Sequence, residues 1–203
     1  MLAGEATSTG LQLGTAAVNG DVFVARLSAT GQWGAVGAIS HSSGTSNTEA
    51  LAVDGQGNAV VLGNMPSATT YTFGTRTLVN PAAGRKFVAR FNPTALAWDY
   101  AQLAPAGGGD GYDFGAAAID GAGTLTATGI LRGTVTFGST TLTNPAAFGN
   151  DTYVAQLASA GLPRLCARPP ASRRRPCSRT RWRPAPQPPY ACQPRPRLPK
   201  YLP

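Results

Sequence analysis

The chain has 203 residues and a formal net charge of +8, but that charge is not spread evenly along it. Residues 1–161 hold six basic and nine acidic residues, a net charge of −3, and residues 162–203 hold the other eleven basic residues and no acidic one. The first 161 residues are therefore mildly acidic, which argues against a basic nucleic-acid-binding domain in them. They also contain no cysteine, so a packed apolar core and not disulfides must stabilise them.

The same part of the chain is rich in Gly, Ala, Thr and Val and poor in charge, which is typical of short strands joined by tight turns. We therefore predict an all-β fold. The first ten residues lack the basic and apolar segments of a signal peptide, and no apolar run approaches the roughly 20 residues that a membrane-spanning helix needs. The sequence predicts neither a signal peptide nor a membrane span.

Several sequence words recur in the same order, which indicates an internal repeat. The word FVARL at residues 23–27 returns as FVARF at 87–91 and as YVAQL at 153–157, which are steps of 64 and 66 residues. Each of the first two words is followed by a tryptophan, Trp33 or Trp98, ten or eleven residues after its phenylalanine.

Two further words repeat at nearly the same interval. ALAVDGQGNAVVLG at residues 50–63 returns as AAAIDGAGTLTATG at 116–129, which is 66 residues on. YTFGTRTLVNPAAG, beginning at Tyr71, returns as VTFGSTTLTNPAAFG, beginning at Val135. Four ordered words at one period define a repeat of about 65 residues.

Each word predicts a β element. FVARL and its copies alternate apolar with polar or small residues, as in a strand with one buried face. The word LAVDGQGNAVVLG places two β-prone runs around a turn from Asp54 to Asn58, which predicts a β-hairpin. The TFG words are strands with Phe73 and Phe137 in the core, and an Asn-Pro turn ends each of them. One repeat therefore supplies four or five short antiparallel strands.

Such strands without intervening helices fit a sandwich, a solenoid or a propeller, and a unit of about 65 residues suits a four-stranded propeller blade with a long loop. The words FVARL, Trp33, AVDGQGN, Gly63 and TFG follow one another in an order that resembles the bacterial SBBP repeats, a β-propeller family. The resemblance covers about residues 11–161 and implies a secreted or cell-surface bacterial protein without an assigned catalytic activity. Because a propeller closes with four to eight blades, we expect antiparallel blades in an incomplete ring.

The repeat also predicts the organisation of the chain. Near the N-terminus, Leu13-Gly14 stands in the place of TFG, so we expect the chain to start inside an array. A third repeat opens at Tyr153, but residues 162–164 read Leu-Pro-Arg where its tryptophan is due. The predicted segments are the end of a truncated repeat (1–20), repeat 1 (21–86), repeat 2 (87–152), the start of a third repeat (153–161) and a tail (162–203).

The tail contains no Gly, Asp or Glu, but holds twelve of the seventeen prolines. We predict that it is disordered, because this composition cannot bury enough apolar area to offset the entropy of ordering. Out-of-frame translation of a GC-rich gene explains the abrupt change, and a genuine Pro/Arg-rich linker is the alternative. Its arginines, with Trp182 and Tyr190 among them, would bind nucleic acid only non-specifically. Cys166, Cys177 and Cys192 form no CxxC pair and have no histidine near them, so no zinc site is predicted.

Few residues of the repeats carry a chemical signal. His41 is the only histidine, and in the segment HSSGTSNTE we expect it to be an exposed loop residue. A Ser-His-Asp triad would need it beside Ser42 or Ser43 and a distant Asp. Asp54 and Asp120 recur at the hairpin turn, where we expect them to cap backbone amides and not to bind a cation.

The segment GGGDGYDFG contains Asp110 and Asp113, which could ligate calcium, but it lacks the spaced oxygen ligands of a known calcium loop. We expect a flexible loop between strands. The recurring aromatic residues are expected in the core, with exposed carbohydrate stacking as the alternative; they are Trp33, Trp98, Phe73 and Phe137.

No catalytic, cofactor-binding or metal-binding residue is therefore predicted. The expected function is that of a non-enzymatic structural or binding module from a secreted or cell-surface propeller, whose loops bind a protein or a glycan when the array is complete. Two alternatives stay open. One is a fragment of a propeller-based hydrolase or lyase, which would need non-repeated His, Asp, Glu or Arg residues converging at the ring centre, and the other is a non-functional frameshifted fragment. Edge strands of an incomplete ring favour aggregation or pairing with another copy.

Overall fold

A computed structural model of the chain describes residues 1–6, 10–42, 46–108, 111–145 and 149–157. Within these ranges the regular secondary structure is all β, and every strand pair is antiparallel, which confirms the all-β, antiparallel part of the expected fold class. The described ranges include no helix of the length and apolarity that crossing a bilayer requires. The predicted tail, and the end of the predicted third repeat before it, lie outside the described residues.

The central sheet has four strands in the order β11–β10–β7–β6. These strands are β6 (Asn47–Val53), β7 (Ala59–Met65), β10 (Arg85–Asn92) and β11 (Ala97–Leu103). The hairpin predicted around residues 54–58 joins β6 to β7, and a second hairpin joins β10 to β11. The word FVARF is thus an inner strand, paired on both of its edges.

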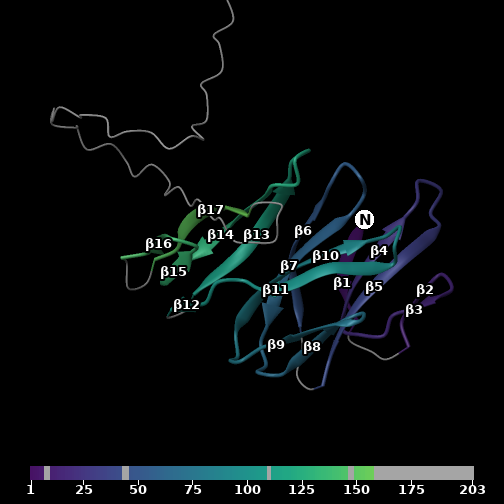
Figure 1. The fold of residues 1–203 in the computed structure, drawn as a ribbon, viewed down its shortest axis with the longest axis horizontal. Helices are drawn as coiled ribbons and strands as arrows, with labels where there is room; N and C mark the ends of the chain where they lie inside the picture. Colours follow the sequence, from purple (N-terminus) through teal and green to yellow (C-terminus); the bar gives the residue numbers. More distant parts are fainter. Residues whose placement is uncertain (7–9, 43–45, 109–110, 146–148, 158–203) are drawn as a thin grey trace, which may run out of the picture. The chain divides into compact units, whose positions relative to one another are not determined.

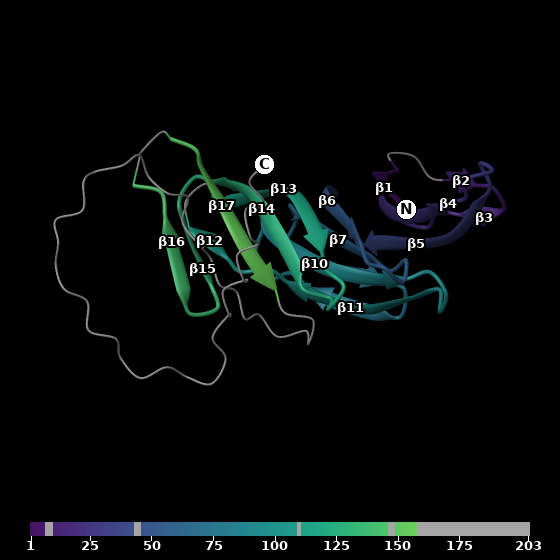
Figure 2. The same cartoon turned by 90° about the horizontal axis from the view of Figure 1, so that it is seen from above.

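Two flanking sheets repeat parts of the central one. In the first sheet, β1 (Leu2–Glu5), β4 (Val22–Leu27) and β5 (Trp33–His41) take the places of β7, β10 and β11. In the other, β13 (Tyr112–Ile119), β14 (Leu125–Leu131) and β17 (Asp151–Leu157) take the places of β6, β7 and β10. Figures 1 and 2 show the central sheet between these two sheets.

Each TFG word forms a short hairpin, which lies in the sequence between β7 and β10 or between β14 and β17. The hairpins are β8 (Thr70–Phe73) with β9 (Arg76–Val79), and β15 (Thr134–Phe137) with β16 (Thr140–Thr143). The hairpins do not pair with the sheet whose strands precede and follow them in the sequence: β8 pairs with β5, and β15 pairs with β12 (Gly107–Gly108), which follows β11. Backbone hydrogen bonds therefore join β8 and β9 to the first sheet, whereas β12, β15 and β16 form a separate three-stranded sheet.

The turn of this hairpin has the same shape three times. Gly14, Gly74 and Gly138 have φ angles of 65°, 61° and 59°. Glycine adopts this left-handed conformation at little cost, whereas most other residues do not. The first of these glycines lies between β2 (Gln12–Leu13) and β3 (Ala16–Ala17), so the structure places Leu13-Gly14 at the hairpin position that Phe73-Gly74 occupies.

Both faces of the central sheet are covered by apolar side chains. One face packs against the first sheet and β8, in a cluster that includes Val22, Ile39, Phe73, Phe87 and Trp98. The other face packs against the third sheet and its hairpin, in a cluster that includes Leu62, Val88, Leu125, Phe137 and Tyr153. The expectation that Phe73, Phe137 and Trp98 lie in the core is confirmed, while Trp33 is half-buried against the N-terminal hairpin.

The prediction of one buried face per strand is wrong for the first two copies of the FVARL word. Phe23, Val24 and Ala25 are all buried, because the N-terminal hairpin packs on one face of β4 and the central sheet on the other. Phe87, Val88 and Ala89 are all buried, because neighbouring sheets cover β10 on both faces. In the third copy the predicted alternation does hold, since Tyr153 is buried while Val154 is 45% exposed. The outer face of the third sheet is thus uncovered among the described residues.

Candidate functional site

The two recurring aspartates occupy equivalent hairpin turns. In each turn, Oδ1 of Asp54 or Asp120 accepts hydrogen bonds from the backbone N–H groups two and four residues further on, at 2.8–2.9 Å. Gly57 and Gly123 take positive φ angles of 84° and 80° at the same place in the two turns. The predicted role of these aspartates in capping backbone amides is confirmed.

Asp54 also anchors its turn to the sheet. Its Oδ2 accepts a 2.8 Å hydrogen bond from Nη2 of Arg90 on β10. Burial acts to raise the pKa of Asp54, but hydrogen bonds from Asn58, Arg90 and Gln56 lower it below the usual value. The carboxylate therefore remains ionised at neutral pH and serves as a fixed acceptor.

His41 is not an exposed loop residue, so that expectation is wrong. It ends β5, and its side chain is 12% exposed because β5 continues past its last pair with β4 to pair with β8. Its ring packs edge-on against Tyr71 at 5.4 Å. Nε2 of His41 donates to Oδ2 of Asp21 at 2.7 Å.

The described residues around His41 do not form a catalytic triad. In a triad the imidazole lies between a serine hydroxyl and the carboxylate. Here the hydroxyl of Ser46 donates at 3.0 Å to the same oxygen of Asp21 that binds His41. Ser42 instead hydrogen-bonds Thr69 through its hydroxyl at 2.5 Å, and residue 43 lies outside the described residues.

The segment GGGDGYDFG is not one loop. Gly107–Gly108 form β12, and β13 begins at Tyr112, so Asp113 is a strand residue paired with Ile130. The loop expectation is therefore wrong for Asp113, because the pairing of β13 with β14 begins before it. Asp110 lies outside the described residues.

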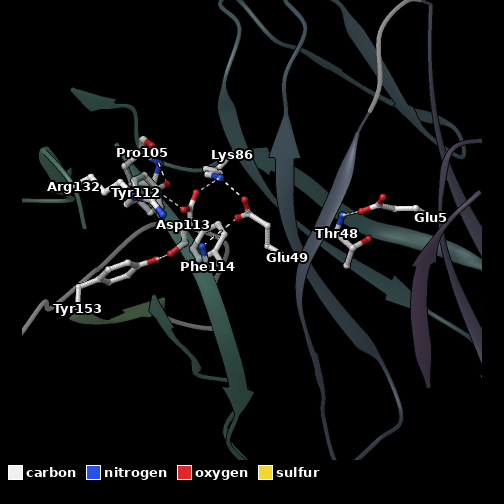
Figure 3. A network of polar contacts seen from close by, with 10 residues as sticks. All are labelled: Glu5, Thr48, Glu49, Lys86, Pro105, Tyr112, Asp113, Phe114, Arg132 and Tyr153. Atoms are coloured by element: carbon white, nitrogen blue, oxygen red, sulfur yellow. Dashed lines mark hydrogen bonds and ion pairs between the residues drawn. The ribbon is translucent and has the colours of Figure 1, made fainter. Parts of the chain in front are cut away.

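Asp113 belongs to a network of four charged side chains, and the sequence patterns pointed to none of the other three. Lys86 on β10 pairs with Glu49 on β6 and with Asp113 on β13, its Nζ lying 3.0 Å from Asp113 Oδ1 (Figure 3). Arg132 pairs with the other oxygen of Asp113. The Lys86 side chain is only 8% exposed, and two carboxylates compensate its buried charge. Burial acts to raise the pKa of Asp113, but hydrogen bonds from Arg132 and Lys86 lower it overall.

Glu49 extends the network to the backbone of the next sheet. Its Oε2 accepts a 3.1 Å hydrogen bond from the N–H of Phe114, beside the β-bulge of β13. One repeat earlier, Oε1 of Glu5 accepts a 3.2 Å bond from the N–H of Thr48, beside the bulge of β6 (Figure 3). Thr48 and Phe114 are equivalent positions, whereas Glu5 on β1 and Glu49 on β6 are not. A bulge disrupts the regular ladder of its strand, and in both cases a glutamate of the neighbouring sheet satisfies the amide beside it.

Two buried tyrosines complete the surroundings of the network. Tyr112 donates to the carbonyl of Pro105 at 2.9 Å, and Tyr153 donates to the carbonyl of Asp113 at 3.1 Å. Burial raises the pKa of both hydroxyls, and the negative charge of Glu49 adds to this effect. Both are therefore protonated hydrogen-bond donors at physiological pH and not general bases.

A polar cavity of about 400 Å³ borders the network, lined in part by Asn64, Arg85, Lys86, Tyr112 and Asp113. Two buried atoms of its lining residues, Oδ1 of Asn64 and Nε of Arg85, have no hydrogen-bond partner among the described residues. The cavity thus combines both signs of charge with open hydrogen-bonding capacity. Chemically, it suits a small polar molecule or ordered water.

The charged residues of the network do not recur along the chain. One period after Glu49 and Lys86 stand Gly115 and Thr152, and one period before Asp113 and Arg132 stand Asn47 and Pro66. This departure from the repeat is the signal by which the sequence could have revealed them. Their convergence depends on how the sheets pack, since Lys86 is 37 residues from Glu49 and 27 from Asp113.

In the ranges that the structure describes, no group of three or more His, Cys, Asp or Glu side chains is placed to hold a metal ion. The described fold defines an all-β repeat protein of antiparallel sheets. No protein-family model matches the chain, and neither a curated protein nor a solved structure matches it. The likeness to SBBP repeats is thus carried by the sequence words alone.

Proposed function

We propose that the chain is a non-enzymatic structural or binding module of a β-propeller protein, with the four-stranded central sheet as one blade. The observation that carries this proposal is the packing of the central sheet between two sheets that repeat its strands, with apolar clusters on both faces. Adjacent propeller blades pack face to face in this way. By the resemblance to SBBP repeats, the protein belongs outside a bacterial cell or on its surface.

The uses of the ionisable side chains support a module that binds without catalysing. Asp54 and Asp120 cap turns, while Glu5 and Glu49 each accept an amide of the neighbouring sheet. Lys86 and Arg132 compensate carboxylates within the network. These roles hold sheets together. In the complete array, loops between the strands would contact a protein or glycan partner.

A propeller-based hydrolase or lyase is the second candidate, and one observation favours it. Non-repeated Glu49, Lys86, Asp113 and Arg132 converge beside a polar cavity, as an enzyme on this fold would require. Ion pairs hold all four, however, and a general base needs a free, correctly protonated group within reach of substrate. The binding module is therefore the better supported function.

The test is a turnover assay of the full chain against a panel of glycosides, uronic-acid polymers and esters. We expect no rate above that of the Lys86→Met and His41→Ala variants. Turnover that either variant abolishes, and that the exposed control Arg26→Met retains, would refute the binding module in favour of an enzyme. Circular dichroism of each variant verifies that it is folded.

A further inference from the structure

In the central sheet, Trp98 fastens the outermost strand to the core. Its side chain is 5% exposed and packs against the rings of Phe73 and Phe91, at centroid distances of 5.4 and 5.3 Å. Nε of Arg76 donates to the backbone carbonyl of Trp98 at 2.6 Å. Strand β11 is thus held by backbone hydrogen bonds to β10 and by the packing of its Trp98 side chain against Phe73 of the β8–β9 hairpin.

The third sheet lacks this strand among the described residues. β17 corresponds to β10, but its paired neighbour within the described residues is β14 alone. One period after Trp98 stands Arg164, with Pro163, Pro169 and Pro170 around it.

An apolar cavity of about 340 Å³ lies where a counterpart of Trp98 would pack. Phe137, Gly138 and Ala155 line it, and their counterparts in the preceding repeat are Phe73, Gly74 and Ala89. All three counterparts adjoin Trp98 or belong to its cluster: a Cβ built on Gly74 would lie 3.4 Å from the Trp98 ring. The equivalent cluster of the third sheet contains no tryptophan.

The opposite wall of the cavity comes from the central sheet. Leu62 and Val88 line it, and Val88 is the counterpart of Val24, which belongs to the same cluster as Trp98. Both walls of the cavity thus match those around Trp98. The internal repeat therefore shows directly which kind of side chain fits there.

We propose that the edge of β17 that no described strand covers and this cavity form a docking site for an extended, tryptophan-bearing segment of a different protein of the same repeat type, and not of a second copy of this chain. The segment adds to β17 as β11 adds to β10, and its indole fills the cavity beside Phe137. Backbone hydrogen bonds along the edge supply affinity, and the cavity supplies specificity. This inference rests on the proposed function, because it names the partner of a module that binds.

The experiment uses the full chain and a labelled peptide that copies residues 92–104, which contain β11 and Trp98. Fluorescence anisotropy measures binding, and hydrogen exchange measures protection of the β17 amides. We expect one peptide per chain and new protection in β17. Replacing the peptide tryptophan by alanine should weaken binding at least about tenfold, since a buried aromatic anchor carries much of the energy of such contacts.

A matched pair of protein variants tests the cavity itself. Thr136 lines the cavity and Thr141, its cross-strand partner, does not, although both are exposed on the same hairpin. Thr136→Trp should obstruct the cavity and weaken peptide binding about tenfold or more. Thr141→Trp should bind the peptide as the unmodified chain does. Equal loss in both variants would contradict docking in the cavity.

Three other outcomes would overturn the proposal. The first is that the peptide proves not to bind at millimolar concentration, or to bind equally well without its tryptophan. The second is that the β17 amides prove to be protected already in the dilute free chain, which would mean that the chain's own residues occupy the edge. The third is that protection of the β17 amides rises with protein concentration alone, which would identify a second copy of this chain as the occupant. None of these outcomes refutes the proposed function, which fails only on specific turnover in the assay above.

Discussion

Nζ of Lys86 lies 3.0 Å from Oδ1 of Asp113, and this ion pair joins two sheets that belong to successive repeats. Lys86 also holds Glu49, which accepts the N–H of Phe114 on the same strand as Asp113. One lysine therefore organises two independent links from the central sheet to β13. The apolar cluster between these sheets supplies most of their attraction, while the charged network fixes how they align.

Replacing Lys86 by methionine should destabilise the protein. The change keeps the aliphatic stem but leaves the carboxylates of Glu49 and Asp113 facing each other without the cation between them. We expect the free energy of unfolding in urea to fall by about 2–4 kcal/mol. Arg26→Met, at an exposed site, should change it by less than about 0.5 kcal/mol. Similar losses in the two variants would show that the network contributes nothing specific.

Gly63→Ala should be strongly destabilising, because a Cβ at Gly63 would lie 2.2 Å from the carbonyl oxygen of Asn47 and 2.6 Å from the ring of Phe87. The backbone of the neighbouring strand would have to move. We expect a loss of about 2 kcal/mol or more in urea unfolding. Gly55→Ala, where nothing lies within 4 Å, is the control and should be neutral within about 0.5 kcal/mol.

Asn80→Ala should cost about 2 kcal/mol, measured as a shift in the urea midpoint. The buried Nδ2 of Asn80 donates to the carbonyls of Met65 and Ser67, at 3.0 and 2.7 Å, and alanine leaves both without this donor. Asn80→Asp should be worse, since a carboxylate cannot donate to either carbonyl. If the aspartate variant proved as stable as the original protein, the amide would have no such role. Asn150→Ala, at an exposed position, is the control.

Leu96→Asn should stabilise the protein. Leu96 is the one non-glycine residue with positive φ in the described part of the chain, at 53°, and it is 66% exposed. The left-handed conformation costs leucine about 1 kcal/mol, whereas asparagine tolerates it. We expect a gain of up to about 1 kcal/mol in thermal or urea unfolding, with Ala95→Asn unchanged as the control. A loss of stability would mean that the leucine side chain makes a contact that outweighs the strain.

Acid should destabilise the protein in part through Asp54 and Asp113. Their pKa values in the folded state are lowered below the ordinary aspartate value of 3.8, so the folded state binds these protons more weakly than the unfolded state. The stability that they contribute is fully present above pH 3.8 and is lost as the pH falls through their lower folded values. The urea midpoint should therefore drop as the pH is lowered from about 4 towards these lower values, and drop less in the Asp54→Asn, Asp113→Asn double variant. Equal drops would contradict the assignment.

The parts of the fold that depend on local chemistry could be predicted from the sequence. Asp54 and Asp120 are read correctly as turn residues, because the preference of Asp-Gly sequences for tight turns is set within five residues. Phe73 and Phe137 recur in register, which is why their burial could be foreseen. The order of the words likewise fixes which strands form hairpins.

The parts that depend on packing between sheets could not be predicted. His41 is half-buried because β8 pairs with the end of β5, and the residues next to His41 in the sequence give no sign of this pairing. Glu49 and Lys86 are ordinary strand residues by pattern, and only the meeting of β6, β10 and β13 makes them partners. For the same reason, the alternation of the FVARL word did not reveal that Val88 is buried.

The pairing of β8 with β5 determines how such an array can be divided or enlarged. β8 and β9 lie between β7 and β10 in the sequence, yet β8 is hydrogen-bonded to the preceding sheet. A segment cut from the chain so as to contain the whole central sheet, from β6 to β11, would carry β8 and β9 without their partner strand β5. A duplicated period that is inserted within an existing array, in contrast, follows a sheet with which its hairpin can pair. Duplication inside an array is therefore the route by which this chain could lengthen without losing a strand pair. The unit that is copied in this way includes the pairing between one sheet and the next.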